Sequence, residues 1–296
     1  MKSSLLYGIL LGVMAAPAFG AGIADEPIGK GSVLNENIFK FQLGHFEVYT
    51  LIENKGQGRA AILIGADEEA LGKYIAGGVY QSETNTFLIR TPEQTILVDT
   101  GFGTTLFESL KTLGVSPDTI DAVLITHLHG DHFSGLQKDG TALFSKADVY
   151  VAEQEKEYWT KTNVSQGAVA ALAPYGTRVK TFLPGELGSK LNDLLPGITA
   201  IAAFGHTPGH TLFQLESSGQ KLLIWGDIMH AQTIQFPLPD VSVTYDTDPA
   251  AAAAIRKQVL EYAAANNIPI AGMHLTFPAI GNVVKEAGGY RLNDAK

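Results

Sequence analysis

The chain has 296 residues, of which 45% are hydrophobic, and it carries a formal net charge of −9. This length is enough to bury a large core. The acidic balance argues against nucleic acid or an anionic membrane surface as a partner, because both require a basic face. Cysteine is absent, so disulfides, a thiolate nucleophile and cysteine ligands to a metal are excluded. Any reactive site must be built from histidine, aspartate, glutamate and water.

The first 20 residues have the pattern of a secretory signal peptide. Lys2 supplies a positive charge, residues 5–16 are mostly apolar, and Ala18-Phe19-Gly20 offers small residues where a signal peptidase cuts. We expect cleavage near Gly20, a periplasmic or secreted mature protein, and no stable membrane association. The alternative is an N-terminal membrane anchor, for which the apolar run is short. No linker divides residues 21–296, which we interpret as a single domain.

The elements predicted before residue 126 follow a polar leader that ends near Asn37. In chain order they cover residues 39–51 (a strand hairpin), 67–75 (a helix), 84–90 and 95–101 (two strands), 104–113 (a helix) and 121–125 (a buried strand). Asp99 closes one of these strands beside a glycine-containing loop. Its carboxylate either orients a nearby ligand histidine or bonds its own turn.

The loop after residue 125, Thr126-His127-Leu128-His129-Gly130-Asp131-His132, places three imidazoles and a carboxylate within six positions. Alternate residues of extended backbone share a face, so His127 and His129 point to one side. Gly130 permits a sharp turn, after which Asp131 and His132 point back toward the same space. Zinc and similar divalent ions take nitrogen and oxygen ligands, so we predict that this loop binds metal.

Strands and helices continue to alternate beyond the loop. The predicted strands cover residues 147–151, 180–183, 198–204, 211–215, 221–225 and 268–271, and the predicted helices cover 153–159, 167–172 and 249–265. The helix over 249–265 is rich in alanine, the best helix former. We expect 268–271 to be the last strand of the chain.

Three of these strands are followed directly by a residue that can bind metal. His206 follows the strand over 198–204, Asp227 follows 221–225, and His274 follows 268–271. Rigid strands fix the geometry of the loops that they lead into. We therefore expect the three side chains to join the histidine loop in one site at an edge of the sheets.

With these residues the chain resembles the metallo-β-lactamase-fold hydrolases, and among them the exported branch of methyl parathion hydrolases and related lactonases. The residues that carry the resemblance are His127, His129, Asp131 and His132 in the pattern His-x-His-x-Asp-His, then His206, Asp227 and His274, with the runs 98–101, 205–211 and 274–278. The resemblance implies an α+β fold, a four-layer αββα sandwich, with two divalent metal ions at one edge.

The resemblance also implies a set of ligands. Metal one would take His127, His129 and His206, metal two would take Asp131, His132 and His274, and Asp227 would bridge both. Two dications about 3.5–4 Å apart require a shared anion, and metal-bound water whose pKa falls to about 7 is a nucleophile at neutral pH. We expect Zn²⁺, while Mn, Co or Fe suit the same ligands.

His230 bears on the choice of substrate. It lies three residues beyond Asp227, where related acyl-homoserine lactonases carry a tyrosine. An N–H at this place would polarise a carbonyl or protonate a leaving alkoxide, which suits opening of a lactone or ester. The candidate catalytic residues are thus Asp131, Asp227 and His230, the alternative for His230 being a histidine packed beneath the site. We expect His210 to support a ligand or to be structural.

Four aromatic residues are candidates for the substrate pocket: Trp159, which matches an aromatic in the methyl parathion hydrolase pattern, and Phe102, Phe107 and Phe236. The three phenylalanines are expected on loops that line the mouth, where they would favour an aromatic or apolar substrate. The alternative is that these residues belong to the core. The segment 163–174 is shorter than in the methyl parathion hydrolases, so their full aromatic pocket does not carry over.

The sequence thus predicts a dinuclear-metal-dependent hydrolase that opens small-molecule lactones or aryl esters, of the dihydrocoumarin or acyl-homoserine lactone type. The alternatives are an organophosphate triester hydrolase, a non-catalytic metal-binding protein and a diiron redox protein. A β-lactamase is disfavoured, because by resemblance those enzymes lack a bridging aspartate at Asp227 and often use a cysteine ligand. Whether the protein forms a homodimer is left open.

Overall fold

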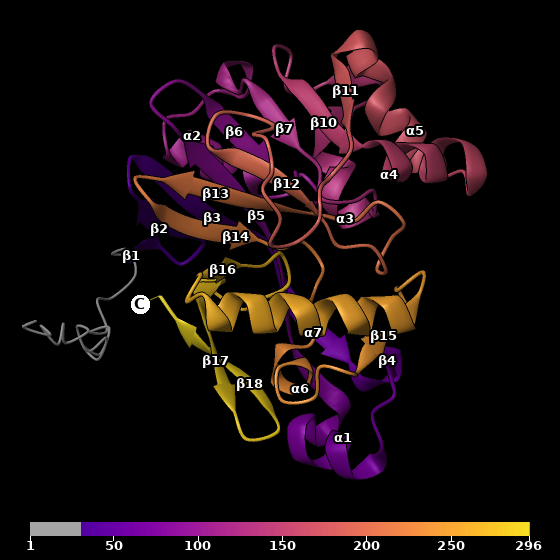
Figure 1. The fold of residues 1–296 in the computed structure, drawn as a ribbon. Helices are drawn as coiled ribbons and strands as arrows, with labels where there is room; N and C mark the ends of the chain where they lie inside the picture. The colour runs from indigo at the N-terminus through magenta and orange to yellow at the C-terminus, as the bar shows by residue number, and fades with distance from the viewer. Residues whose placement is uncertain (1–30, 296) are drawn as a thin grey trace, which may run out of the picture.

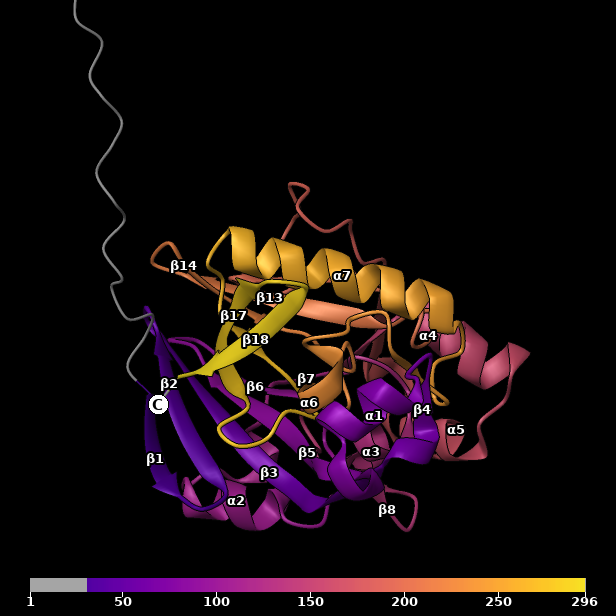
Figure 2. The same cartoon turned by 90° about the horizontal axis from the view of Figure 1, so that it is seen from below.

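The computed structural model describes residues 31–295, and its elements stack in four layers (Figure 1). Two β-sheets pack face to face, with a hydrophobic core between them. Figure 2 shows α7 (Pro249–Ala265) on one outer face and α2 (Leu106–Thr112) on the opposite outer face. The α+β class and the αββα sandwich expected from the sequence are therefore confirmed.

The first sheet has eight strands in the order β1-β2-β3-β5-β6-β7-β10-β11. They are β1 (Gly31–Asn35), β2 (Ile38–Leu43), β3 (Phe46–Arg59), β5 (Val79–Arg90), β6 (Thr95–Val98), β7 (Ala122–Leu124), β10 (Asp148–Ala152) and β11 (Val179–Phe182). The strands from β6 to β11 run parallel to one another. Because the carboxyl ends of parallel strands meet at one edge, the chain leaving β6 and β7 delivers Asp99 and the histidine loop to the same place.

The second sheet has six strands in the order β12-β13-β14-β16-β17-β18. They are β12 (Ile198–Ala202), β13 (Thr211–Ser217), β14 (Gln220–Ile224), β16 (Ile270–Ala271), β17 (Ile280–Glu286) and β18 (Gly289–Asp294). Strands β14 and β16 pair in parallel, and their other neighbours are antiparallel. The carboxyl ends of β14 and β16 therefore place Asp227 and His274 side by side.

Alternation along the strands builds two cores from one sheet. Phe39 and Phe41 of β2 face the second sheet, while Ile38 of the same strand packs on the opposite face with Leu106 and Leu110 of α2. This follows from the two-residue period of a strand, which sends successive side chains to opposite faces. The central strands are buried on both faces, so their sequence is a continuous apolar run.

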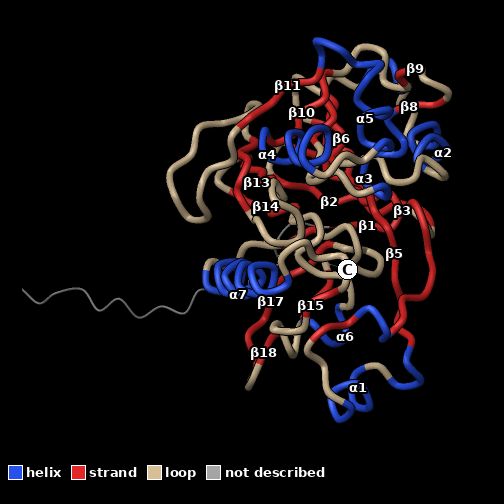
Figure 3. Tube along the Cα trace, turned by 90° about the vertical axis from the view of Figure 1, so that its right-hand side faces the viewer, coloured by secondary structure: helices blue, strands red, loops and turns tan. Residues whose placement is uncertain are grey.

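A smaller lobe lies at the far end of the long hairpin formed by β3 and β5 (Figure 3). Its elements are α1 (Glu68–Tyr74), α6 (Gln232–Gln235) and the paired short strands β4 (Leu63–Ile64) and β15 (Ser242–Val243). Its core includes Tyr80, Ile234 and Val241. The lobe therefore joins the hairpin to the segment that follows Asp227.

The remaining elements lie mostly on the outer face of the first sheet. They are α3 (Gly130–Phe133), α4 (Glu153–Glu157), a π-helical turn (Tyr158–Thr162), α5 (Gln166–Leu172), the strand pair β8 (Gln137–Lys138) and β9 (Thr141–Ala142), and short 3₁₀ turns at Ala60–Ile62, Ala76–Gly78, Pro117–Thr119, Ser134–Leu136 and Ala173–Arg178. Among residues 31–295, no helix has the length and apolarity needed to span a membrane. The predicted signal peptide, residues 1–20, lies outside the described residues.

Two predictions at the ends of the chain were wrong. The polar leader contains β1, and the strand at 268–271 is not the last one, because the β17–β18 hairpin follows it. β1 is mostly exposed and is held to β2 by main-chain pairing, so it carries no hydrophobic pattern. β17 and β18 alternate only weakly, and the second sheet supplies their partner strand.

We expect Leu215→Ala to lower the free energy of unfolding by about 2–5 kcal/mol, because Leu215 is fully buried between the sheets and the smaller side chain leaves a cavity. Urea titration at a fixed zinc concentration measures the change. The control is Leu183→Ala, since Leu183 is 70% exposed and should lose less than about 1 kcal/mol. Equal losses in the two variants would contradict the position of the core.

Candidate metal centre

The histidine loop leaves β7 in an extended conformation and turns into α3. His129 is still extended, with φ −86° and ψ 154°, and the helical turn begins at Gly130. The loop is anchored by Asp99, which accepts hydrogen bonds from the Thr126 amide (2.8 Å) and hydroxyl (2.7 Å). This anchor holds the loop in the position from which its side chains reach the site.

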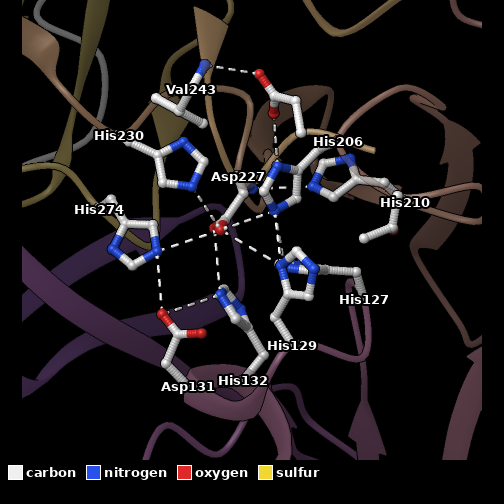
Figure 4. Close-up of polar contacts among 12 residues, drawn as sticks. His127, His129, Asp131, His132, His206, His210, Asp227, His230, Val243 and His274 are labelled. Carbon is white, nitrogen blue, oxygen red and sulfur yellow. Dashed lines mark hydrogen bonds and ion pairs between the residues drawn. The ribbon is translucent and has the colours of Figure 1, made fainter. Parts of the chain in front are cut away.

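The first cluster contains three imidazoles whose ring nitrogens face one another (Figure 4). His127 Nε2 lies 3.1 Å from His129 Nδ1, and His206 Nε2 lies 3.2 Å and 3.0 Å from these two atoms. Asp227 Oδ2 closes the group at 3.5 Å from His127 Nε2 and 3.3 Å from His206 Nε2. Four ligand atoms from three separate loops thus surround one point.

The second cluster contains Asp131, His132 and His274. His274 Nε2 lies 3.3 Å from Asp131 Oδ2 and 3.2 Å from Asp227 Oδ2. His132 Nε2 lies 3.6 Å from Asp131 Oδ2 and 3.3 Å from the other Asp227 oxygen, Oδ1. Asp227 therefore contacts both clusters, and Figure 4 shows its carboxylate at the centre of the group.

The distances and the unpaired atoms fit divalent metal ions. A zinc ion with four tetrahedral ligands at about 2.0–2.1 Å keeps those ligand atoms about 3.3 Å apart, close to the separations in both clusters. His132 Nε2 and Asp227 Oδ1 are buried and have no hydrogen-bond partner among residues 31–295. Buried polar atoms without partners are rare, and those that occur call for an ion or a water. Both clusters therefore have the donors, spacing and unused lone pairs of metal sites.

The buried charges of the two clusters depend on one another. Burial alone would raise the pKa of Asp227, but His132 and His274 outweigh it and hold this pKa well below its usual range. Burial also opposes protonation of His274, yet Asp227 and then Asp131 raise its pKa to about 10. Burial and the neighbouring imidazoles lower the pKa of His129 to about 3, so it is a neutral donor. A bound dication would replace the protons that the carboxylates otherwise hold on nearby histidines.

The ring nitrogens of His132 and His274 that point away from the clusters are held by a second group. Asp99 Oδ2 lies 2.7 Å from His132 Nδ1, and the Glu83 carbonyl lies 2.7 Å from His274 Nδ1. His210 Nε2 accepts from the Asp227 amide at 2.9 Å, while its Nδ1 faces the Ala203 carbonyl at 3.1 Å. Such partners fix the tautomer and orientation of metal-binding histidines. Asp99 and His210 thus lie where sequence reasoning expected supporting residues.

Asp246 and Arg256 are supporting residues that the sequence did not indicate. Asp246 Oδ1 lies 2.7 Å from His206 Nδ1. Arg256 is 1% exposed, donates to the Ile228 carbonyl (2.6 Å) and lies 3.9 Å from Asp246 Oδ2. Asp246 stands 40 positions from His206, and Arg256 sits in an alanine-rich helix, so no local motif marks either residue.

Glu155 was also missed, because it lies in a short helix that carries exposed charges. Its buried carboxylate accepts from the Leu128 amide (2.8 Å), the Thr207 hydroxyl (2.7 Å) and the Gly209 amide (2.8 Å). It also accepts from the Trp159 indole at 2.7 Å. One side chain thereby ties together the two loops that carry His127, His129 and His206.

A cleft of about 630 Å³ opens over the clusters. Its lining includes Asp131, Asp227, His129, His230 and His274, together with residues of the β3–β5 hairpin. His230 lies on its wall, with Nε2 3.0 Å from Asp227 Oδ2 and Nδ1 buried without a partner. His230 thus lines the cleft beside Asp227 and is not packed beneath the site.

Of the four aromatic candidates, only Phe102 lines this cleft, with its side chain 45% exposed. Phe107 was expected on a loop but lies in α2, where it stacks on Phe144 at 5.8 Å. Phe236 is buried beside Trp225 in the core. Phe107 and Phe236 thus do not line this cleft: Phe107 packs half-buried against the core on the outer face of the first sheet, and Phe236 is buried in the core between the sheets.

Trp159 lies beside the histidine loop and outside the cleft. Its ring lies 5.4 Å from the His129 ring, and its indole is bonded to Glu155. It packs against a histidine of the first cluster and is not among the residues that line the cleft. Its contact is therefore with the metal-binding loop.

Comparison with known proteins identifies the superfamily of the chain. The model of the metallo-beta-lactamase superfamily matches residues 79–266, and the chain belongs to this superfamily. The solved structure of hydrolase AbOPH, of the beta lactamase superfamily, is 30% identical, with a TM-score of 0.79 over 87% of this chain and 97% of that one. Fold, clusters and match together place the chain among the metal-dependent hydrolases of this superfamily.

More distant relatives are diverse. AidC, a dizinc quorum-quenching lactonase solved with the product N-hexanoyl-L-homoserine, shares the fold at 24% identity, with a TM-score of 0.77 over 87% of this chain and 97% of that one. Exodeoxyribonuclease WalJ of Streptococcus pneumoniae is 30% identical over 106 residues. That match spans 34% of this chain and 38% of WalJ. The relatives named here are a hydrolase, a lactonase and an exodeoxyribonuclease, so their names alone do not select an activity.

We expect Asp99→Asn to weaken zinc binding by about 10–100-fold, because His132 loses the carboxylate that orients it and raises its basicity. Competition with a chromogenic chelator measures the affinity of each site. Asp121→Asn is the matched control, since Asp121 is an exposed carboxylate that accepts from the Thr95 amide far from the clusters. Unchanged affinity in Asp99→Asn would contradict the role of this contact.

Proposed function

We propose that the protein is a dinuclear metal-dependent hydrolase that opens lactones or aryl esters. The observation that carries the proposal is the carboxylate of Asp227, which five imidazoles approach within 3.5 Å. A buried anion between two groups of neutral or exchangeable nitrogen donors is what two adjacent dications require. The open cleft above it gives a small molecule access to this point.

The proposed ligands divide between the two clusters. One ion would be held by His127, His129 and His206, the other by Asp131, His132 and His274, with Asp227 shared. Zinc suits these donors, and the supporting carboxylates Asp99 and Asp246 keep His132 and His206 in the required tautomer. When bound, the ions supply a nucleophilic water of lowered pKa and polarise the carbonyl.

The role proposed for His230 is to bind the oxygen of the substrate. Its ring lies 4.9 Å from the rings of both His206 and His274, and its Nε2 points toward the Asp227 carboxylate (Figure 4). A proton on Nε2 is held by Asp227 Oδ2 at 3.0 Å. The same N–H can donate to a carbonyl or to a leaving oxygen in its place.

The comparisons support a small-molecule substrate without selecting it. Two of the solved relatives, AidC and an N-acyl homoserine lactone hydrolase, carry N-hexanoyl-L-homoserine in their structures. The net charge of −9 favours a small molecule over nucleic acid. From the N-terminal pattern we also propose that the protein is exported to the periplasm or beyond.

We expect the zinc-loaded protein to turn over dihydrocoumarin and N-hexanoyl homoserine lactone with a kcat/KM at least tenfold above that for methyl paraoxon. A lactone carbonyl uses both the polarising ions and the donor at His230. Steady-state kinetics on the three compounds measure the order. A higher efficiency on the triester would favour an organophosphate hydrolase, and no turnover of any ester would favour a metal-binding protein.

We expect His230→Leu to lower kcat on lactones by about 100-fold while the zinc content stays at wild-type level, because the variant removes a donor to the developing oxyanion. Kinetics and elemental analysis of the same samples separate the two effects. His45→Leu is the matched control, since His45 is exposed at the β2–β3 turn. Loss of one metal ion from His230→Leu would instead make His230 a ligand.

A further inference from the structure

The wall of the cleft beyond the clusters is formed by one face of the β3–β5 hairpin. Tyr80, Ser82 and Thr84 alternate along β5, and all three line the cleft. In the register of the hairpin, Tyr80 stands opposite Gly58 of β3. Because residues two apart share a face of a strand, the side chains on this face of the hairpin all face the cleft.

Gly58 makes room for the ring of Tyr80. A Cβ atom at Gly58 would lie 2.2 Å from Cζ and 2.5 Å from the hydroxyl oxygen of Tyr80. Glycine weakens a strand but allows another group to lie against the backbone. The Tyr80 ring is therefore held flat across β3.

The Tyr80 residue is 7% exposed, and its hydroxyl, which makes no hydrogen bond to the part of the chain that the structure describes, lies at the surface of the cleft. Burial and then Tyr245 raise the pKa of Tyr80 to about 12, so the phenol is protonated at neutral pH. A protonated phenol is a hydrogen-bond donor. Its place in the lining of the cleft makes a bound molecule its available partner.

Tyr245 lies on the other side of the same space. It follows β15, is 55% exposed and lines the cleft. Its ring lies 6.1 Å from that of His230, at an interplanar angle of 49°. The next residue, Asp246, holds His206 and so fixes the backbone from which the Tyr245 ring projects.

We propose that Tyr80 and Tyr245 form a subsite for an aromatic ring that carries an oxygen acceptor. The Tyr245 ring packs on the ring of the substrate, and the Tyr80 hydroxyl donates a hydrogen bond to its oxygen substituent. Within the proposed hydrolase function, on which this inference rests, the substrate class becomes aryl esters and benzo-fused lactones with an oxygenated ring. Straight-chain acyl lactones offer no ring on which Tyr245 can pack.

The test is binding of ring fragments to the full-length, zinc-loaded protein. The probes are 2-, 3- and 4-methoxyphenol, with cyclohexanol as the non-aromatic reference, and Kd is measured by ligand-observed NMR. We expect one methoxyphenol isomer to bind at least tenfold more tightly than cyclohexanol. Tyr80→Phe, which keeps the ring, should weaken this isomer about fivefold, and Tyr245→Leu should weaken it about three- to tenfold.

Tyr262→Phe is the control, because Tyr262 lies on α7, does not line the cleft, and loses only a hydroxyl that donates to Gln214 of β13. It should leave every Kd unchanged. Equal affinity for cyclohexanol, or no effect of Tyr80→Phe, would overturn the subsite. Binding does not require turnover, so a protein that binds methoxyphenol but cleaves no ester would refute the hydrolase proposal and leave the subsite standing.

Discussion

The structure depends on the buried carboxylate of Asp227. This anion is 2% exposed, and its immediate neighbours are imidazoles delivered by three different strand ends and the histidine loop. An isolated charge in such a place would be prohibitively costly, so its surroundings must supply positive charge. The protein meets this demand with nitrogen donors whose lone pairs converge in two groups, and the two proposed cations would satisfy the donors and the carboxylate together. The central claim is therefore that Asp227 is the shared anion of a two-metal site.

The fold holds this arrangement through contacts behind the donors. The parallel strands β6 and β7 place Asp99 against the histidine loop, while the parallel pair β14 and β16 sets Asp227 beside His274. Glu155 ties the histidine loop to the loop that carries His206. The donors thus belong to a rigid edge of two packed sheets, and the cleft over them is shaped by the separate lobe and the β3–β5 hairpin. The proposed metal donors and the wall of the cleft therefore belong to different parts of the chain.

The sequence predicted which donors the fold brings together, because the information is local there. Each donor segment follows an apolar strand, and the histidine loop carries four possible ligands within six positions. The supporting groups Asp246, Arg256 and Glu155 could not be predicted, since each acts across a long sequence separation and sits in an ordinary loop or helix. The pocket was predicted least well. Phe107 and Phe236 are aromatic, as the residues of pocket walls often are, but they pack between layers of the fold. Tyr80 reaches the cleft only because of the register of the hairpin and the space left by Gly58.

The most direct measurement of the central claim is anomalous diffraction from crystals of the zinc-loaded protein at the zinc edge. The account predicts two peaks of comparable height per chain, about 3.5–4 Å apart, one beside His127, His129 and His206 and the other beside Asp131, His132 and His274, with the Asp227 carboxylate touching both. A single peak, or two peaks of which one has no contact with Asp227, would contradict it.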